Sequence, residues 1–183
     1  KNIWVYPTGI VSTALYVYSL FKIGLLGDMM INFYYTVMSI YGWILWAKSS
    51  ADHVHVEVSH ATKKEWMVSA GLFLVSLLLV TVVYYYKPFI DNQFSTENVN
   101  FGLYHLDWAN WLDIFTTAIF LVGMWLMAKR KVENWIFWII GDLICIPMML
   151  YKGLGITSVQ YLVFTVMAVI GYLEWKKNRV PNP

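Results

Sequence analysis

Long uncharged stretches alternate with short polar segments along this chain. Four stretches contain no charged residue over the length of a membrane-spanning helix, and two others contain one aspartate each, Asp113 and Asp142. A helix needs about 20 mostly apolar residues to cross the hydrocarbon core of a bilayer. The pattern therefore predicts an all-α integral membrane protein with six visible transmembrane helices, over residues 3–21, 29–47, 67–86, 108–128, 135–151 and 153–173.

Composition agrees with a membrane protein and excludes several other classes. Of the 183 residues, 59% are hydrophobic and only 13% are charged, whereas a soluble domain averages about 25% charged residues. The net charge of +2, without a long basic run or a glycine-rich phosphate loop, argues against nucleic-acid binding. The single cysteine, Cys145, excludes a cysteine-type zinc site. Catalytic motifs are also lacking, so we expect no enzyme activity, metal or cofactor.

The distribution of basic residues predicts how the helices are oriented. If the six helices alternate in direction, ten Lys and Arg residues fall on one side of the membrane and three on the other. Cytoplasmic loops carry the excess of Lys and Arg. We therefore expect a multi-pass protein of the inner (plasma) membrane, with the C-terminal tail in the cytoplasm.

Two helical segments repeat one another at a constant offset of 129 residues. Residues 36–38 and 165–167 are both Thr-Val-Met, and Gly42 and Trp46 correspond to Gly171 and Trp175. Parallel repeats of this kind occur in transporters. The helix over 108–128 has no earlier partner, so we expect a seventh helix before residue 3 and a three-plus-one-plus-three plan. Shared interface chemistry of the two helix ends is the alternative explanation.

The repeat also predicts how the chain is divided. Residues 1–48 would be the remainder of the first three-helix repeat, and residues 49–107 a linker helix with its flanking loops. Residues 108–183 would be the second repeat and the cytoplasmic tail.

One helical stripe carries the strongest candidate site. Trp135, Trp138 and Asp142 have the spacing i, i+3, i+7, which places them on one face of a helix. Indole faces attract a cationic planar ring, and a carboxylate adds electrostatic selection. In the alternative, the tryptophans are interfacial anchors and Asp142 pairs with another helix. That explanation suits Trp135 best, because Asp142 lies about 10 Å deeper.

Polar residues in two other helices are weaker candidates. Asn32 and Thr36 share a stripe of the segment 29–47, and Gln160 shares one with Phe164 in the segment 153–173. Such amides and hydroxyls also hold membrane helices together, so a structural role is an even alternative. His53, His55 and Glu57 alternate in a loop and resemble a metal-ligand pattern, but we favour a solvated loop.

The segment 133–142 resembles a known signature. It reads Glu-Asn-Trp-Ile-Phe-Trp-Ile-Ile-Gly-Asp and matches the W-x-x-W-x-x-x-N/D motif of the Pnu-type vitamin transporters, a family best known for carrying nicotinamide riboside. The likeness extends along nearly the whole chain. It includes Trp4, Pro7 and Gly9 in the first helix, the Tyr41-Gly42-Trp43 segment, Asp113, and Gly171-Tyr172.

This resemblance implies a homotrimer of seven-helix subunits that moves a vitamin down its gradient, with a cytoplasmic kinase trapping the vitamin by phosphorylation. It implies a substrate site lined by Trp135, Trp138 and Asp142, with polar contacts from Asn32, Thr36 and Gln160. Nicotinamide riboside is the favoured substrate.

Two departures from the family pattern keep alternatives open. Asp142 stands where the nicotinamide riboside branch often has Asn, and Asn32 stands where it often has Gln. An acid in the site would also suit thiamine, which likewise carries a cationic ring. A membrane scaffold or sensor, in which the polar stripes only join helices, is the alternative from another class.

Overall fold

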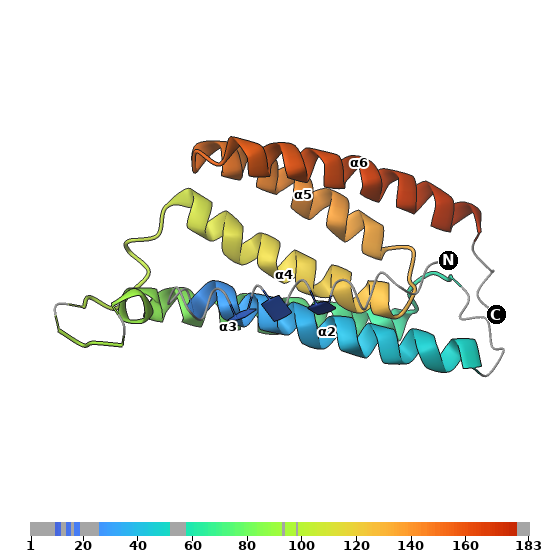
Figure 1. Cartoon of the computed structure of the whole chain (residues 1–183), viewed down its shortest axis with the longest axis horizontal. Helices are drawn as coiled ribbons and strands as arrows, with labels where there is room; N and C mark the ends of the chain where they lie inside the picture. The colour runs from blue at the N-terminus through green and yellow to red at the C-terminus, as the bar shows by residue number, and fades with distance from the viewer. Residues whose placement is uncertain are drawn as a thin grey trace. The chain divides into compact units, whose positions relative to one another are not determined.

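The computed structural model is all-helical over the residues that it describes, which are 10–11, 14–15, 17–18, 26–51, 58–92, 94–97 and 99–178. This part of the chain contains five named helices, which Figure 1 labels. They are α2 (Leu26–Ala51), α3 (Lys63–Asp91), α4 (Trp108–Ala128), α5 (Asn134–Tyr151) and α6 (Gly155–Lys177). The predicted all-α class is therefore confirmed for the described residues.

Four of the five described helices, α3 to α6, are long and apolar enough to cross a membrane. They coincide with the predicted segments 67–86, 108–128, 135–151 and 153–173. The segment 29–47 is helical as predicted, within α2, but α2 is not among the four. Its tyrosines, tryptophans and polar residues lower the mean hydropathy of the helix. Most of the segment 3–21 lies outside the described residues, so the helix count and the repeat stay predictions.

The chain divides into two compact units. The first comprises Lys1–Val56 and Thr81–His105, and the second comprises Glu57–Val80 and Leu106–Pro183. Each unit is described by itself below. The domain boundaries predicted from the repeat, after residues 48 and 107, stay predictions.

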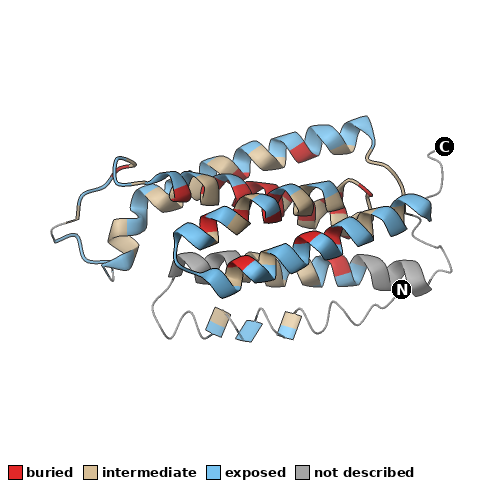
Figure 2. Ribbon diagram, turned by 90° about the horizontal axis from the view of Figure 1, so that it is seen from above, coloured by how far each residue is buried: buried red, intermediate tan, exposed pale blue. Residues whose placement is uncertain are grey.

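Helix α4 forms the core of the second unit. Eleven of its 21 residues are buried, whereas only Ser69 and Ser76 are buried on α3 (Figure 2). Helix α5 packs against α4 on one side and α6 on another. At the α5–α6 contact, the Ser158 hydroxyl donates a hydrogen bond of 2.9 Å to the carbonyl of Ile146, the residue before Pro147. Thus α4, α5 and α6 form the packed part of this unit.

Local hydrogen bonds set the starts of two helices. Before α3, the Thr62 hydroxyl accepts from the Glu65 backbone N–H while the Glu65 carboxylate accepts from the Thr62 N–H, at 3.3 and 2.8 Å. This reciprocal pair is a capping box. Before α4, the Asp107 carboxylate accepts from the Asn110 N–H at 2.8 Å. Each cap satisfies backbone donors that would otherwise lack partners.

The segment before α3 is docked on the turn between α4 and α5. Ser59 and Lys131 form an isolated parallel bridge, and Nδ1 of His60 lies 2.7 Å from Oε1 of Glu133. The end of the predicted solvated loop is therefore held in place by a contact between His60 and Glu133, which are 73 positions apart in the sequence. His53, His55 and Glu57 lie outside the described residues. Within the described residues no group of three metal-ligating side chains occurs.

Candidate functional site

The predicted stripe of α5 lines a pocket in the second unit. Trp135, Trp138 and Asp142 share a cavity of about 200 Å³ with Met127 of α4 and with three residues of α6. The α6 residues are Phe164, Met167 and Ala168. Helical periodicity explains the alignment on α5, because positions i, i+3 and i+7 recur on one face. The structure therefore brings three of the six predicted site residues together.

Asp142 is the ionisable residue of this pocket. It is only 3% exposed, and the other pocket residues are apolar or aromatic. A carboxylate inside the membrane region is costly, so such residues usually face a cavity, a partner or a substrate. Asp142 lies at a cavity wall, where a cationic ligand group would offset part of that cost.

Trp138 is positioned by α4. Its ring stacks on Phe120, with 5.2 Å between the centroids and 27° between the planes. Phe120 in turn lies directly over Gly141, where a Cβ atom would meet its ring. A Cβ atom on Gly123 would lie 3.5 Å from Nε1 of Trp138. One face of the Trp138 ring is thus already covered, and Gly141 leaves the space that the Phe120 ring occupies.

Trp135 is positioned by α6. A Cβ atom on Gly171 would come within 2.6 Å of the Trp135 ring, so the glycine permits the close approach. Trp175 meets the same ring edge to face, with centroids 5.4 Å apart. The Nε1 atoms of Trp135 and Trp138 are buried, and neither has a hydrogen-bond partner among the described residues. Two indole donors therefore lie unsatisfied beside the pocket.

The three other predicted residues are not among those that line this pocket. Gln160 is exposed on α6, one turn before Phe164, and does not line the pocket. In the first unit, the Thr36 hydroxyl donates to the Asn32 carbonyl at 3.0 Å, a bond within α2. Thr165, the repeat-related residue, makes the same kind of bond to Tyr161 at 2.9 Å. The sequence-based assignment of Asn32, Thr36 and Gln160 to a substrate site stays a prediction.

Sequence reasoning missed the contribution of α4. Met127 lines the pocket, and Phe120 and Gly123 support Trp138. One available signal was the glycines, because small residues in membrane helices allow close helix packing. Gly123, Gly141 and Gly171 all lie under an aromatic ring or beside one in this structure.

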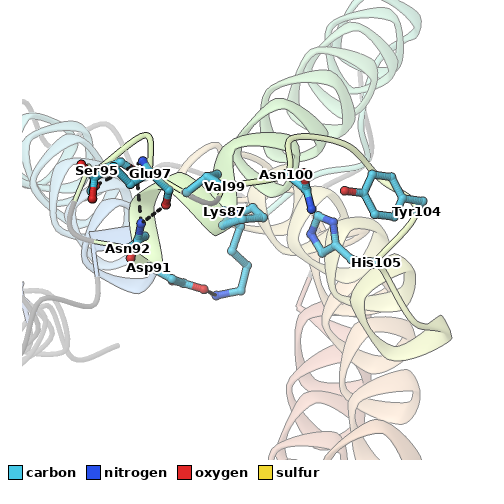
Figure 3. A pocket seen from close by; sticks show the side chains of 10 residues that line it. Lys87, Asp91, Asn92, Ser95, Glu97, Val99, Asn100, Tyr104 and His105 are labelled. Atoms are coloured by element: carbon cyan, nitrogen blue, oxygen red, sulfur yellow. Dashed lines mark hydrogen bonds and ion pairs between the residues drawn. The ribbon is translucent and has the colours of Figure 1, made fainter.

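A second, polar pocket of about 740 Å³ lies in the first unit, where α3 ends (Figure 3). Lys87 and Asp91 form an ion pair of 2.9 Å at its edge. The Asn92 side chain donates to the carbonyls of Ser95 and Glu97, both at 3.2 Å. These bonds organise the loop itself. None of the six predicted site residues lines this pocket, so the α5 pocket is the stronger candidate.

The apolar helices and the buried carboxylate between them define a polytopic membrane protein. The family described as "Nicotinamide mononucleotide transporter" matches residues 1–177, and the chain belongs to that family. It is a family of membrane transporters rather than of enzymes, and several apolar helices fit a multi-pass inner-membrane location. The resemblance drawn from the W-x-x-W-x-x-x-D motif is therefore confirmed.

Individual relatives are distant. The nicotinamide riboside transporter PnuC of Escherichia coli is 23% identical over 93% of this chain and 74% of its own length. The protein of the same name from Neisseria mucosa is 28% identical, over 94% of this chain and 63% of its own. The riboflavin/roseoflavin transporter RibM of Streptomyces davaonensis is 22% identical, over 96% of this chain and 75% of its own length.

A solved structure shares the fold. The crystal structure of the vitamin B3 transporter PnuC aligns with a TM-score of 0.64 and 21% identity, over 96% of this chain and 72% of that one. At this identity the likeness shows the fold alone.

Proposed function

We propose that this protein mediates facilitated uptake of a vitamin with a cationic aromatic ring, with nicotinamide riboside as the favoured substrate. The observation that carries the proposal is the buried Asp142 carboxylate in one pocket with Trp135 and Trp138. The names of the relatives support vitamin transport as the general activity. The pocket chemistry supports the choice of a cationic substrate.

Two groups in the pocket, an indole face and a carboxylate, would attract the positive charge of the ring. A cation near an indole face is attracted by the ring quadrupole, by about 2 kcal/mol or more when desolvated. The Asp142 carboxylate attracts the same positive charge, and the apolar lining reduces screening. The pocket therefore favours a cationic ring over a neutral one, such as the ring of riboflavin.

The pocket accounts for only part of a substrate. Its volume of about 200 Å³ is below the range of about 300–1,000 Å³ for ligand pockets. We assign the ring to this pocket. The resemblance implies that Asn32, Thr36 and Gln160 contribute polar contacts to the substrate.

The remaining elements of the proposal come from the family resemblance and the charge distribution. They are a homotrimer, the three-plus-one-plus-three plan with seven helices, trapping of the vitamin by a cytoplasmic kinase, and a cytoplasmic C-terminus. Thiamine is the second candidate substrate, because it also carries a cationic ring and Asp142 suits it.

Calorimetric titration of the purified protein with nicotinamide riboside and with thiamine tests the proposal. Trp138→Ala should weaken binding roughly 5- to 150-fold, because stacking of a base on an aromatic side chain is worth about 1–3 kcal/mol. Asp142→Asn should keep the fold, since it removes a buried charge without changing shape, and should change which vitamin is preferred.

Trp111→Ala is the matched control, because Trp111 is 47% exposed on α4 and does not line the pocket. It should bind as the wild type does. If Trp138→Ala and Asp142→Asn both bind each vitamin as tightly as the wild type, the stripe serves packing. A membrane scaffold would then be the better explanation, and it predicts no saturable uptake.

A further inference from the structure

An apolar groove separate from the candidate substrate pocket lies on the second unit, between α3, α4 and α5. Its volume is about 340 Å³, and it shares no residue with the pocket around Asp142. Its lining residues are Trp66, Ser69, Ala70 and Phe73 of α3, Phe115 and Ile119 of α4, and Phe137 and Ile140 of α5.

Aromatic pairs form the two walls of this groove. Trp66 lies against Phe137 with 6.2 Å between ring centroids, and Phe73 meets Phe115 edge to face at 5.7 Å. Ala70, one turn from Trp66, presents only a methyl group between them. The two bulky pairs with a small residue between them leave a channel suited to a flexible hydrocarbon chain.

Ser69, one of the lining residues, has a buried hydroxyl. Ser69 is 3% exposed, and its Oγ atom has no hydrogen-bond partner among the described residues. A buried hydroxyl without a partner costs free energy. The Oγ atom adds no polar surface to the groove, whose wall is apolar throughout. The groove itself therefore suits a hydrocarbon chain.

Positive charge lies at one end of the groove. Lys63, Trp66, Ala70 and Phe73 follow one stripe of α3 at helical spacing, so Lys63 continues the groove beyond Trp66. Lys64 is adjacent, and both lysines are exposed. Ser69 lies about 9 Å along the helix axis from Lys63, at 1.5 Å per residue. A charged group bound at Lys63 would therefore lie farther out than the buried hydroxyl.

The turn between α4 and α5 adds cations to the same end. Nζ of Lys131 lies 3.1 Å from Oε2 of Glu65 in the first turn of α3, which joins the two segments. The same turn includes Lys129 and Arg130. The acids of this region are already paired, Glu65 with Lys131 and Glu133 with His60. The balance of charge at this end of the groove is therefore positive.

We propose that this groove binds one phospholipid with an anionic headgroup. An acyl chain lies between the aromatic pairs, and the headgroup meets Lys63 and Lys64. Basic residues at the cytoplasmic ends of membrane helices attract anionic headgroups by about 1 kcal/mol per cation. The charge selects the headgroup, and the groove selects a lipid over a soluble anion.

Native mass spectrometry of the full chain in detergent tests the proposal. The protein is titrated with phosphatidylglycerol and with phosphatidylcholine of identical acyl chains. The wild type should retain one phosphatidylglycerol at lower lipid concentration than phosphatidylcholine. The double variant Lys63→Gln with Lys64→Gln should lose about 5- to 30-fold in phosphatidylglycerol affinity, from one to two lost cations. Its affinity for phosphatidylcholine should not change.

A second variant tests the groove itself. Ala70→Trp should fill the channel and abolish retention of phosphatidylglycerol. Lys152→Gln and Leu74→Trp are the matched controls, because both residues are exposed and neither lines the groove. Both should retain the lipid as the wild type does.

Three results would overturn the proposal. They are equal binding of the two lipids by the wild type, retention of phosphatidylglycerol by Ala70→Trp, and loss of an oligomer rather than of lipid in that variant. The last result would make the groove a contact between copies of the chain. The lipid readout involves no vitamin, so it stands or falls independently of the proposed transport activity.

Discussion

Phe120 of α4 stacks on Trp138 of α5 and at the same time lies over Gly141, the residue before Asp142. The centroids of the two rings are 5.2 Å apart. A single aromatic ring on α4 therefore contacts the backbone and a side chain of the α5 stripe. The orientation of Trp138 and the position of Asp142 depend on this contact.

The first prediction concerns Gly141. In Gly141→Ala the new methyl group would collide with the Phe120 ring, and overpacking of this kind costs about 1–3 kcal/mol. The variant should unfold at lower temperature in detergent and bind nicotinamide riboside more weakly. In Gly71→Ala on α3 the methyl group meets nothing within 4 Å, so this control should be neutral or slightly stabilised. Equal thermal stability of the two variants would contradict the packing argument.

The second prediction concerns the contact between Trp135 and Gly171. Gly171→Ala should displace the Trp135 ring, which a Cβ atom would approach to 2.6 Å, and should lower both stability and ligand affinity. Gly155→Ala on the same helix meets nothing within 4 Å and is the control. Combining Gly171→Ala with Trp135→Phe should recover stability, because the smaller ring relieves the clash. A purely additive double-mutant cycle in thermal unfolding would show that the two residues do not interact.

The third prediction concerns orientation. A reporter fused after Pro183 should be active only in the cytoplasm, and one inserted in the loop 92–107 should be active only outside. The reason is the excess of ten basic residues over three on the predicted cytoplasmic side. Fusion activities measured in intact cells provide the test. The reverse pattern would show that the charge count is misleading here.

The fourth prediction concerns energy coupling. Asp113 and Asp142 are the only acids in the predicted spans, which contain no histidine. A proton relay through a membrane normally uses a chain of such groups. Uptake of nicotinamide riboside into liposomes that contain a trapping kinase should therefore persist when a protonophore is added. Loss of uptake under that treatment alone would indicate proton coupling through Asp142.

The apolar runs by themselves determined where α3, α4, α5 and α6 lie. The length of an apolar run is a property of one segment, and it requires no knowledge of its neighbours. The helical period likewise placed Trp135, Trp138 and Asp142 on one stripe before any contact was known. The family motif lies on that stripe, so the site on α5 was accessible from the sequence.

Only the tertiary structure decided what each stripe meets. Membrane helices are apolar on every side, so hydrophobic periodicity does not reveal which face of α4 packs against α5. It therefore could not predict that Phe120 stacks on Trp138. The pairing of His60 with Glu133 joins residues 73 positions apart, and no local pattern specifies it. The groove at Ala70 exists because bulky rings keep the backbones of three helices apart. The separation depends on side-chain packing, which no single segment specifies.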